Sequence, residues 1–295
     1  MALSFNHKPG LVVYLTTGDP SVDATRAVAV AAIDAGADVI ELGVPFSDPL
    51  ADGPVIQRAS ERAVARGTRM ADVLKIAREI RVARPNAGLV IFTYLNPILR
   101  YGFSRFVDDA AAAGADGVLI TDMIVEEAAE YLVEMDRVGL SPIFLAAPTS
   151  PDERLKAIAK HSKGFVYAIS RVGITGKQEN MTADAAALVA RIRRWSELPV
   201  AVGFGISNAE HVARVAEFAD AAVIGSAIVE LIERSTPEGG IPADGSSSVG
   251  CEAARFLSRP HTLTSDRAAG NTASPASARA AGTVARPENH DAVCE

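Results

Sequence analysis

Short runs of Val, Ile and Leu alternate along this chain with longer segments in which apolar residues recur at helical spacing. One such run, residues 37–40, ends at Glu41, and a segment rich in good helix formers begins near Val55. Eight apolar runs of this kind lie between residue 11 and about residue 234. We expect strands at residues 11–15, 38–42, 88–94, 117–121, 142–146, 164–169, 199–203 and 221–224.

This alternation predicts parallel strands joined by right-handed helical crossovers. Eight such units close most economically into a (β/α)8 TIM barrel of the α/β class, although a doubly wound open sheet fits the same alternation. Residues 34–42 and 112–120 support a barrel, because both run from a helix end through glycine and Ala-Asp into a strand. Gly36 and Gly114 are expected in the left-handed conformation that ends a helix. The loops that follow the strands should then carry the function.

Composition indicates where the folded part of the chain ends. Of the 295 residues 48% are hydrophobic and only 5% aromatic, which suits helices packed closely on a Val- and Ile-rich sheet. After Ser235 the sequence changes to Gly, Ser, Pro, Ala and Thr. We expect one barrel domain over residues 1–258, with its core at 10–235, and a low-complexity, disordered tail over 259–295 that has too few large apolar residues to order.

Charge and cysteine content narrow the class of protein. The net charge of -7 argues against nucleic acid or an anionic membrane surface as the main partner. No apolar stretch approaches the roughly 20 residues of a membrane span, and the first ten residues lack a signal-peptide core, so a cytoplasmic location is expected. Cys251 and Cys294 both fall in the C-terminal segment, which excludes a disulfide framework or a thiolate site in the barrel core at 10–235.

The ends of the predicted strands carry carboxylates but neither lysine nor histidine, which excludes a Schiff-base or zinc aldolase. Glu41 closes an apolar strand, so burial should raise its pKa, while Asp52 on a more polar loop should stay ionised; such a pair suits acid–base catalysis. A magnesium site built from Glu41, Asp48, Asp52 and Asp122 is the alternative. The other residues at strand ends are Thr16, Thr17, Tyr94, Asn96, Ala146, Ala147, Ser170, Arg171, Gly205, Gly225 and Ser226.

Three glycine-bearing segments follow later strands. Residues 203–207 and 225–229 follow the seventh and eighth strands, where barrels often bind phosphate through backbone N–H groups and a helix N-terminus. Residues 170–178 follow the sixth strand and are a candidate lid that contains Arg171, Gly173 and Thr175. An ordinary flexible connection is the alternative for that segment.

Five of these motifs together resemble the tryptophan synthase alpha subunit family: ELGVPFSDPLADGP at 41–54, TTGDP at 16–20, SRVGITG at 170–176, GFGIS at 203–207 and GSAIV at 225–229. The resemblance implies a lyase of tryptophan biosynthesis that cleaves indole-3-glycerol phosphate to indole and glyceraldehyde 3-phosphate. It also implies no cofactor in this chain, no nucleic-acid or membrane partner, and an α2β2 heterotetramer with a beta subunit that carries pyridoxal phosphate.

The resemblance also implies roles for residues. Glu41 is the general acid and base, and Asp52 hydrogen-bonds the indole nitrogen. Thr175 engages the catalytic aspartate when the lid closes, and Asp48 and Asn96 lie in loops that meet the beta subunit. The substrate contacts are the backbone of Gly176, Gly205, Gly225 and Ser226 for the phosphate, and Tyr14, Tyr94, Tyr167 and Phe204 around the indole.

The chain departs from the family pattern at its start, since only nine residues precede Gly10 where relatives usually carry a helix. The barrel floor is therefore expected to be open or covered in another way.

Three other functions remain open for this sequence: a standalone lyase that releases free indole, a phosphoribosyl isomerase, and a catalytically weak modulator of a beta subunit. The isomerase would need an acid–base pair where this chain has Thr16 and Ala146, and intact Glu41 and Asp52 argue against the modulator.

Overall fold

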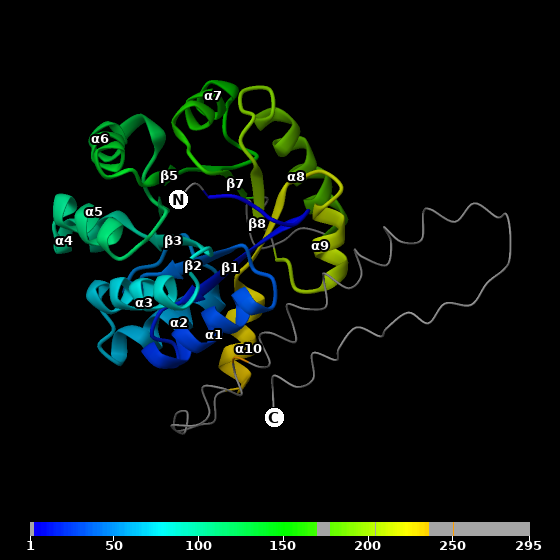
Figure 1. Cartoon of the computed structure of the whole chain (residues 1–295). Coiled ribbons are helices and arrows are strands. Elements are labelled where there is room, and N and C mark those ends of the chain that lie inside the picture. The colour runs from blue at the N-terminus through cyan, green and yellow to red at the C-terminus, as the bar shows by residue number, and fades with distance from the viewer. Residues whose placement is uncertain (1–2, 170–177, 204, 236–249, 251–295) are drawn as a thin grey trace, which may run out of the picture.

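A ring of parallel strands surrounded by helices forms the molecule (Figure 1). The computed structural model describes residues 3–169, 178–203, 205–235 and Gly250. The strands are β1 Gly10–Thr16, β2 Val39–Gly43, β3 Gly88–Thr93, β4 Gly117–Ile120, β5 Ser141–Ile143, β6 Leu145–Ala146, β7 Val166–Ile169, β8 Val200–Gly203 and β9 Ala221–Ile224. The helices are α1 Val22–Asp34, α2 Pro54–Ala65, α3 Met70–Ala83, α4 Leu95–Tyr101, α5 Phe103–Ala112, η1 Val125–Glu127, α6 Ala129–Val138, α7 Asp152–His161, α8 Gln178–Ile192, α9 Ala209–Val215 and α10 Ser226–Ser235.

The sheet closes through the stretch that holds β5 and β6. The strand order is β5-β4-β3-β2-β1-β9-β8-β7-β6, and only Phe144 separates β5 from β6. Its carbonyl accepts a 3.2 Å hydrogen bond from the Tyr167 N–H, so pairing with β7 continues across the break. Residues 141–146 thus act as one strand that pairs on both sides, as the eight-unit barrel requires. The predicted barrel is confirmed, and the open doubly wound alternative is wrong.

Alternation along each strand sends side chains either into the barrel or toward the helices. Val39 belongs to the cluster inside the ring, whereas Ile40 and Leu42 belong to the cluster between the sheet and the helices. Glu41 lies between these two outward residues and is fully buried. Its carboxyl group therefore points into the barrel.

The N-terminal segment closes the floor of the barrel without a helix. Leu3 lies over glycines of the ring, and a Cβ added to Gly164 would come within 2.8 Å of the Leu3 side chain. Phe5 packs on Phe165, with 5.8 Å between the ring centroids. The buried carboxylate of Asp38 accepts hydrogen bonds from the backbone N–H groups of Asn6 and Leu11, each at 2.9 Å.

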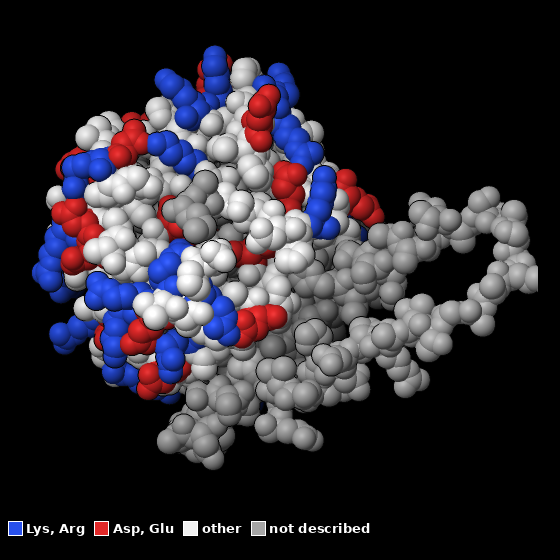
Figure 2. Space-filling model, viewed as in Figure 1, with Lys and Arg blue, Asp and Glu red and all other residues white. Residues whose placement is uncertain are grey.

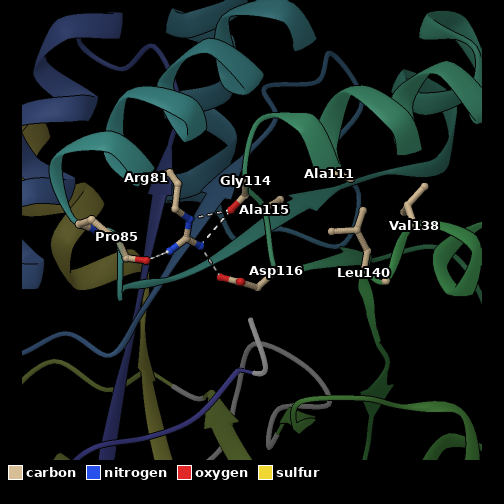
Figure 3. A pocket seen from close by; sticks show the side chains of 9 residues that line it. Arg81, Pro85, Ala111, Gly114, Ala115, Asp116, Val138 and Leu140 are labelled. Atoms are coloured by element: carbon tan, nitrogen blue, oxygen red, sulfur yellow. Dashed lines mark hydrogen bonds and ion pairs between the residues drawn. The ribbon is translucent and has the colours of Figure 1, made fainter.

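A cavity of about 350 Å³ lies at this same end of the barrel, between α3 and the turns before β4 and β5 (Figure 3). Arg81 crosses it and donates to the carbonyls of Gly114, Pro85 and Ala87 and to the carboxylate of Asp116. Because these contacts occupy the guanidinium, Arg81 serves to join turns. The cavity lies at the amino ends of the strands, opposite their carboxyl ends.

The turns before the strands otherwise match the expectations from sequence. Gly36 and Gly114 both have positive φ, at 104° and 83°.

Acidic and basic side chains alternate around the face seen in Figure 2, so neither sign of charge dominates that face. Within the described residues, no helix is both long and apolar enough to cross a membrane.

Candidate active site

Among the residues that the structure describes, Glu41 is the one side chain with two buried oxygens that lack a hydrogen-bond partner. Burial alone raises the pKa of Glu41 to about 8, so the side chain holds a proton at neutral pH. A protonated acid that faces the interior of a barrel near the carboxyl end of a strand is placed to donate that proton to a ligand.

Asp52 lies on the loop between β2 and α2, next to the start of that helix. The loop ends at Gly53, the N-cap, and Pro54 takes the first helical position, which suits its fixed φ and missing N–H. The Tyr94 hydroxyl donates a 2.9 Å hydrogen bond to Asp52 and accepts one of 3.0 Å from the Ala51 N–H. Burial raises the pKa of Asp52 to about 6, and the Tyr94 hydrogen bond opposes that shift. Asp52 thus stays ionised at neutral pH, but in a drier environment than the sequence suggested.

Two buried tyrosines complete the wall around both carboxyl groups. Tyr14 stands beside Glu41 in the register of β1 and β2, and Tyr167 comes from β7 across the ring. The pKa of each tyrosine is raised, first by burial and then by the nearby charges of Asp52 and Glu41. Tyr14 therefore stands next to Glu41 in the sheet, and Tyr94 contacts Asp52 through its hydroxyl group.

The glycine-bearing segments that the sequence predicts as a phosphate site lie at the start of α10 and in the loop after β8. Gly225 is half-buried, and Ser226 is exposed and begins the helix. Gly205, in the neighbouring loop after β8, is exposed and has a φ of 38°, a conformation that favours glycine. Because β8 pairs with β9, these loops lie next to each other, as a two-loop phosphate site requires.

Other predicted site residues lie elsewhere or outside the described part of the chain. Asp48 is exposed on the loop after β2, whereas Asn96 is exposed in the first turn of helix α4 and not on a loop as expected. No group of three or more His, Cys, Asp or Glu able to hold a metal exists among the described residues, so the magnesium alternative is not supported. The lid and tail predictions concern residues that are not described: the lid segment at 170–177 with Arg171, Gly173, Thr175 and Gly176, Phe204 in the indole wall, and the tail at 259–295.

The sequence of this barrel matches a known family model. The model, described as tryptophan synthase alpha chain, matches residues 2–244. This chain belongs to the tryptophan synthase alpha chain family. A tryptophan synthase alpha chain of Solibacter usitatus is 52% identical over 233 residues, which cover 79% of this chain and 87% of that protein. One of Geobacter sulfurreducens is 46% identical, covering 87% of this chain and 93% of that protein.

Solved structures of tryptophan synthase share the fold. The alpha subunit of Legionella pneumophila matches with a TM-score of 0.78 at 35% identity, covering 88% of this chain and 94% of that one. A chain of the Mycobacterium tuberculosis tryptophan synthase, in an aminoacrylate-bound form, matches with a TM-score of 0.74 at 37% identity, covering 85% and 93%. The chain is therefore a lyase-family alpha subunit of tryptophan biosynthesis, and the known reaction of this family is cleavage of indole-3-glycerol phosphate.

Two aromatic residues of this alpha chain were missed by the sequence analysis. Phe92 meets Tyr14 edge-on with ring centroids 5.0 Å apart, and Phe46 packs on Tyr94 at 5.3 Å. Phe92 follows the inward residue Val90 by two positions, so strand alternation could have identified it. Phe46 had no such signal, because it lies in an irregular loop.

Proposed function

We propose that this chain cleaves indole-3-glycerol phosphate into indole and glyceraldehyde 3-phosphate, with Glu41 as the acid and base. The observation that carries this proposal is the buried carboxyl group of Glu41, which has no partner for either oxygen. An unsatisfied buried polar group costs stability, and such groups persist mainly where a function uses them. The proposed indole-3-glycerol phosphate lyase activity depends on acid–base catalysis by this carboxyl group.

Glu41 carries one proton through the reaction. The bond between the glycerol side chain and C3 of the indole breaks only after C3 is protonated and the ring has become an indolenine. Glu41 gives its proton to C3 and, now a carboxylate, takes the proton of the adjacent glycerol hydroxyl. The oxygen then forms the aldehyde carbonyl, and the electrons of the broken bond return to the ring as indole. The pKa of about 8 keeps Glu41 ready as the acid at neutral pH.

Asp52 supports the same step from the other side of the ring. Its carboxylate accepts a hydrogen bond from the indole N–H and stabilises the positive charge that develops when C3 is protonated. Tyr94 holds that carboxylate by a 2.9 Å hydrogen bond. Burial strengthens the attraction between Asp52 and the ring, because little water remains to screen it.

The remaining contacts are proposed from the family resemblance together with the geometry at the start of α10. The backbone at Gly205, Gly225 and Ser226 binds the phosphate at a helix N-terminus. Gly176 adds to this site, and Thr175 and Phe204 contribute to lid closure and to the indole wall. No cofactor is needed in this chain, since every proton in the scheme is carried by a side chain or the substrate.

We propose a beta subunit that carries pyridoxal phosphate as the partner, in an α2β2 assembly. The segments after the neighbouring strands β2, β3 and β4, which include helix α4, hold Asp48 and Asn96 and also expose three large apolar side chains. Leu50 is 90% exposed, and Leu99 and Ile124 are also exposed. Apolar side chains gathered around polar ones are typical of a protein–protein interface.

An assay of indole release from indole-3-glycerol phosphate tests the proposal. Wild-type protein should release indole, and Glu41→Gln should lose about 10²- to 10⁴-fold in kcat while it still binds substrate. Glu61→Gln is the matched control, because Glu61 is an exposed glutamate of α2. Near-normal turnover by Glu41→Gln would refute the role of Glu41. Assays with and without a beta subunit distinguish an alpha subunit from a standalone lyase. A standalone lyase would cleave the substrate rapidly without the beta subunit and would form no complex with it.

A further inference from the structure

Four charged side chains link three separate segments at the catalytic end of the barrel. Asp19, Arg58, Arg62 and Glu233 form this group, which we call the mouth network. Nε and Nη2 of Arg62 donate to the two carboxylate oxygens of Asp19 at 2.9 and 2.6 Å, and Nη1 donates to Glu233 at 2.7 Å. Arg58 donates to both oxygens of Glu233 at 3.0 and 2.8 Å. Asp19 belongs to the TTGDP motif, which the proposed reaction does not use.

Three of the four side chains in the mouth network are largely shielded from water, whereas Arg58 is 49% exposed. The Asp19 side chain is only 3% exposed, and those of Arg62 and Glu233 are 28% and 27% exposed. The hydrogen bond from Arg58, followed by that from Arg62, lowers the pKa of Glu233 to about 2. Two-point contacts of a planar guanidinium fix orientation as well as distance. Arg62 therefore holds the loop after β1 and helix α10 in a fixed relative position.

An apolar layer lies under the mouth network. Ala59 of α2, Val229 of α10 and Tyr14 of β1 form one buried cluster. Gly18 is pressed against the turn after α2, since a Cβ added to it would lie 2.1 Å from the Thr68 hydroxyl oxygen. The loop after β1, helix α2 and helix α10 thus pack as one unit, and the mouth network covers its outer side.

The two helices of this unit carry the two ends of the proposed substrate site. Asp52 lies two residues before Pro54, the first residue of α2, and Ser226 is the first residue of α10. In the proposed function, Asp52 binds the indole nitrogen and the start of α10 binds the phosphate. Any shift between α2 and α10 therefore changes the distance between the two anchors.

We propose that Arg62 is a positioning residue that sets the separation of the indole anchor and the phosphate anchor, through its bonds to Asp19 and Glu233. This inference rests on the proposed function. A ligand with both ends gains affinity over its fragments only when the anchors match its length, because the second contact is then intramolecular. Loss of Arg62 should therefore weaken an intact ligand more than either fragment.

Binding of three ligands to purified Arg62→Met tests the proposal. The ligands are indole, glycerol 3-phosphate, and a non-cleavable compound in which a propyl chain joins C3 of indole to a phosphate. The affinity for each fragment should stay nearly unchanged, whereas the joined compound should bind about 10- to 100-fold more weakly and kcat/KM should fall to a similar extent. Arg62→Lys should recover part of the loss, since it keeps the charge but not the two-point contact.

Arg84→Met is the matched control, because Arg84 makes a bidentate pair with Asp34 between the ends of α3 and α1. If Arg62→Met does not fold by circular dichroism, Glu233→Gln removes the charged contact between α2 and α10 and keeps the Asp19 pair. Equal weakening of all three ligands, or of none, would overturn the positioning role. Absence of indole release by wild-type protein would instead overturn the proposed function.

Discussion

At the scale of single residues, Glu41 should make the protein less stable as the pH rises. Its pKa is about 8 in the folded protein and 4.5 in an ordinary environment. Between these values the folded state holds a proton that the unfolded state has released, so the free energy of unfolding falls as pH increases through this window and levels off above it. Glu41→Gln removes the titrating group, and its stability relative to wild type should therefore grow from pH 5 to pH 8.

Urea unfolding of both proteins at the two pH values measures this difference. Any fixed cost of burying the amide cancels, because only the change with pH is compared. Identical pH dependence of the two proteins would show that Glu41 titrates normally. The stability that wild type gives up at neutral pH is consistent with a group kept for chemistry.

Asp52 and Glu41 together predict a bell-shaped pH profile. Activity should rise as Asp52 ionises near pH 6 and fall as Glu41 loses its proton near pH 8. Tyr94→Phe removes the hydrogen bond that lowers the pKa of Asp52, so the acid limb of kcat/KM should move to higher pH while the alkaline limb stays. Tyr101→Phe, which loses a comparable bond to Asp109, is the control and should leave both limbs in place.

The sequence predicted the environment of Glu41 better than that of Asp52. Glu41 could be singled out because a charged residue that ends an apolar strand is unusual, and the strand period fixes the face on which it lies. The prediction that Asp52 lies on a polar loop was wrong in part. Burial raises the pKa of Asp52, and no local sequence pattern reveals that burial. Its contact with Tyr94, 42 residues further along the sequence, also forms only in the folded chain.

At the scale of elements, the N-terminal segment should stabilise the barrel without touching the chemistry. Leu3 is buried against Gly88, Gly117 and Gly164 at the floor. Leu3→Ala should therefore lower the free energy of unfolding by about 2–5 kcal/mol, the range for a buried leucine, and leave kcat unchanged below the melting transition. Val82→Ala, at an exposed position of α3, should change stability by no more than about 0.5 kcal/mol.

A Leu3→Ala protein as stable as wild type would mean that this segment does not contribute to the floor. The apolar runs predicted all eight strands of the ring, because each run has its own local signal. The floor had no such signal, since the first nine residues form neither a helix nor a strand pattern. Their place depends on glycines that leave room at the starts of β3 and β4 and just before β7.

At the scale of the whole molecule, the exposed apolar loops predict where a partner chain binds. Leu50→Glu should weaken binding of a beta subunit about tenfold or more and leave the intrinsic cleavage by the isolated chain largely intact, because a charge at the centre of an interface is costly to bury. Val133→Glu, at an exposed position of α6, is the control. Titration calorimetry with a purified beta subunit measures the effect, and equal affinity for both variants would move the partner site elsewhere.

The pairing of β9 with β1 has a consequence for how the protein is made. Gly10 lies opposite Ala221, so the first strand finds one of its two neighbours only near the end of the described chain. During synthesis the early strands can stack in order, but β1 keeps an open edge until residues 221–224 have left the ribosome. The nascent chain therefore exposes an unpaired, aggregation-prone strand edge during this interval, and chaperone binding should protect it most at this stage.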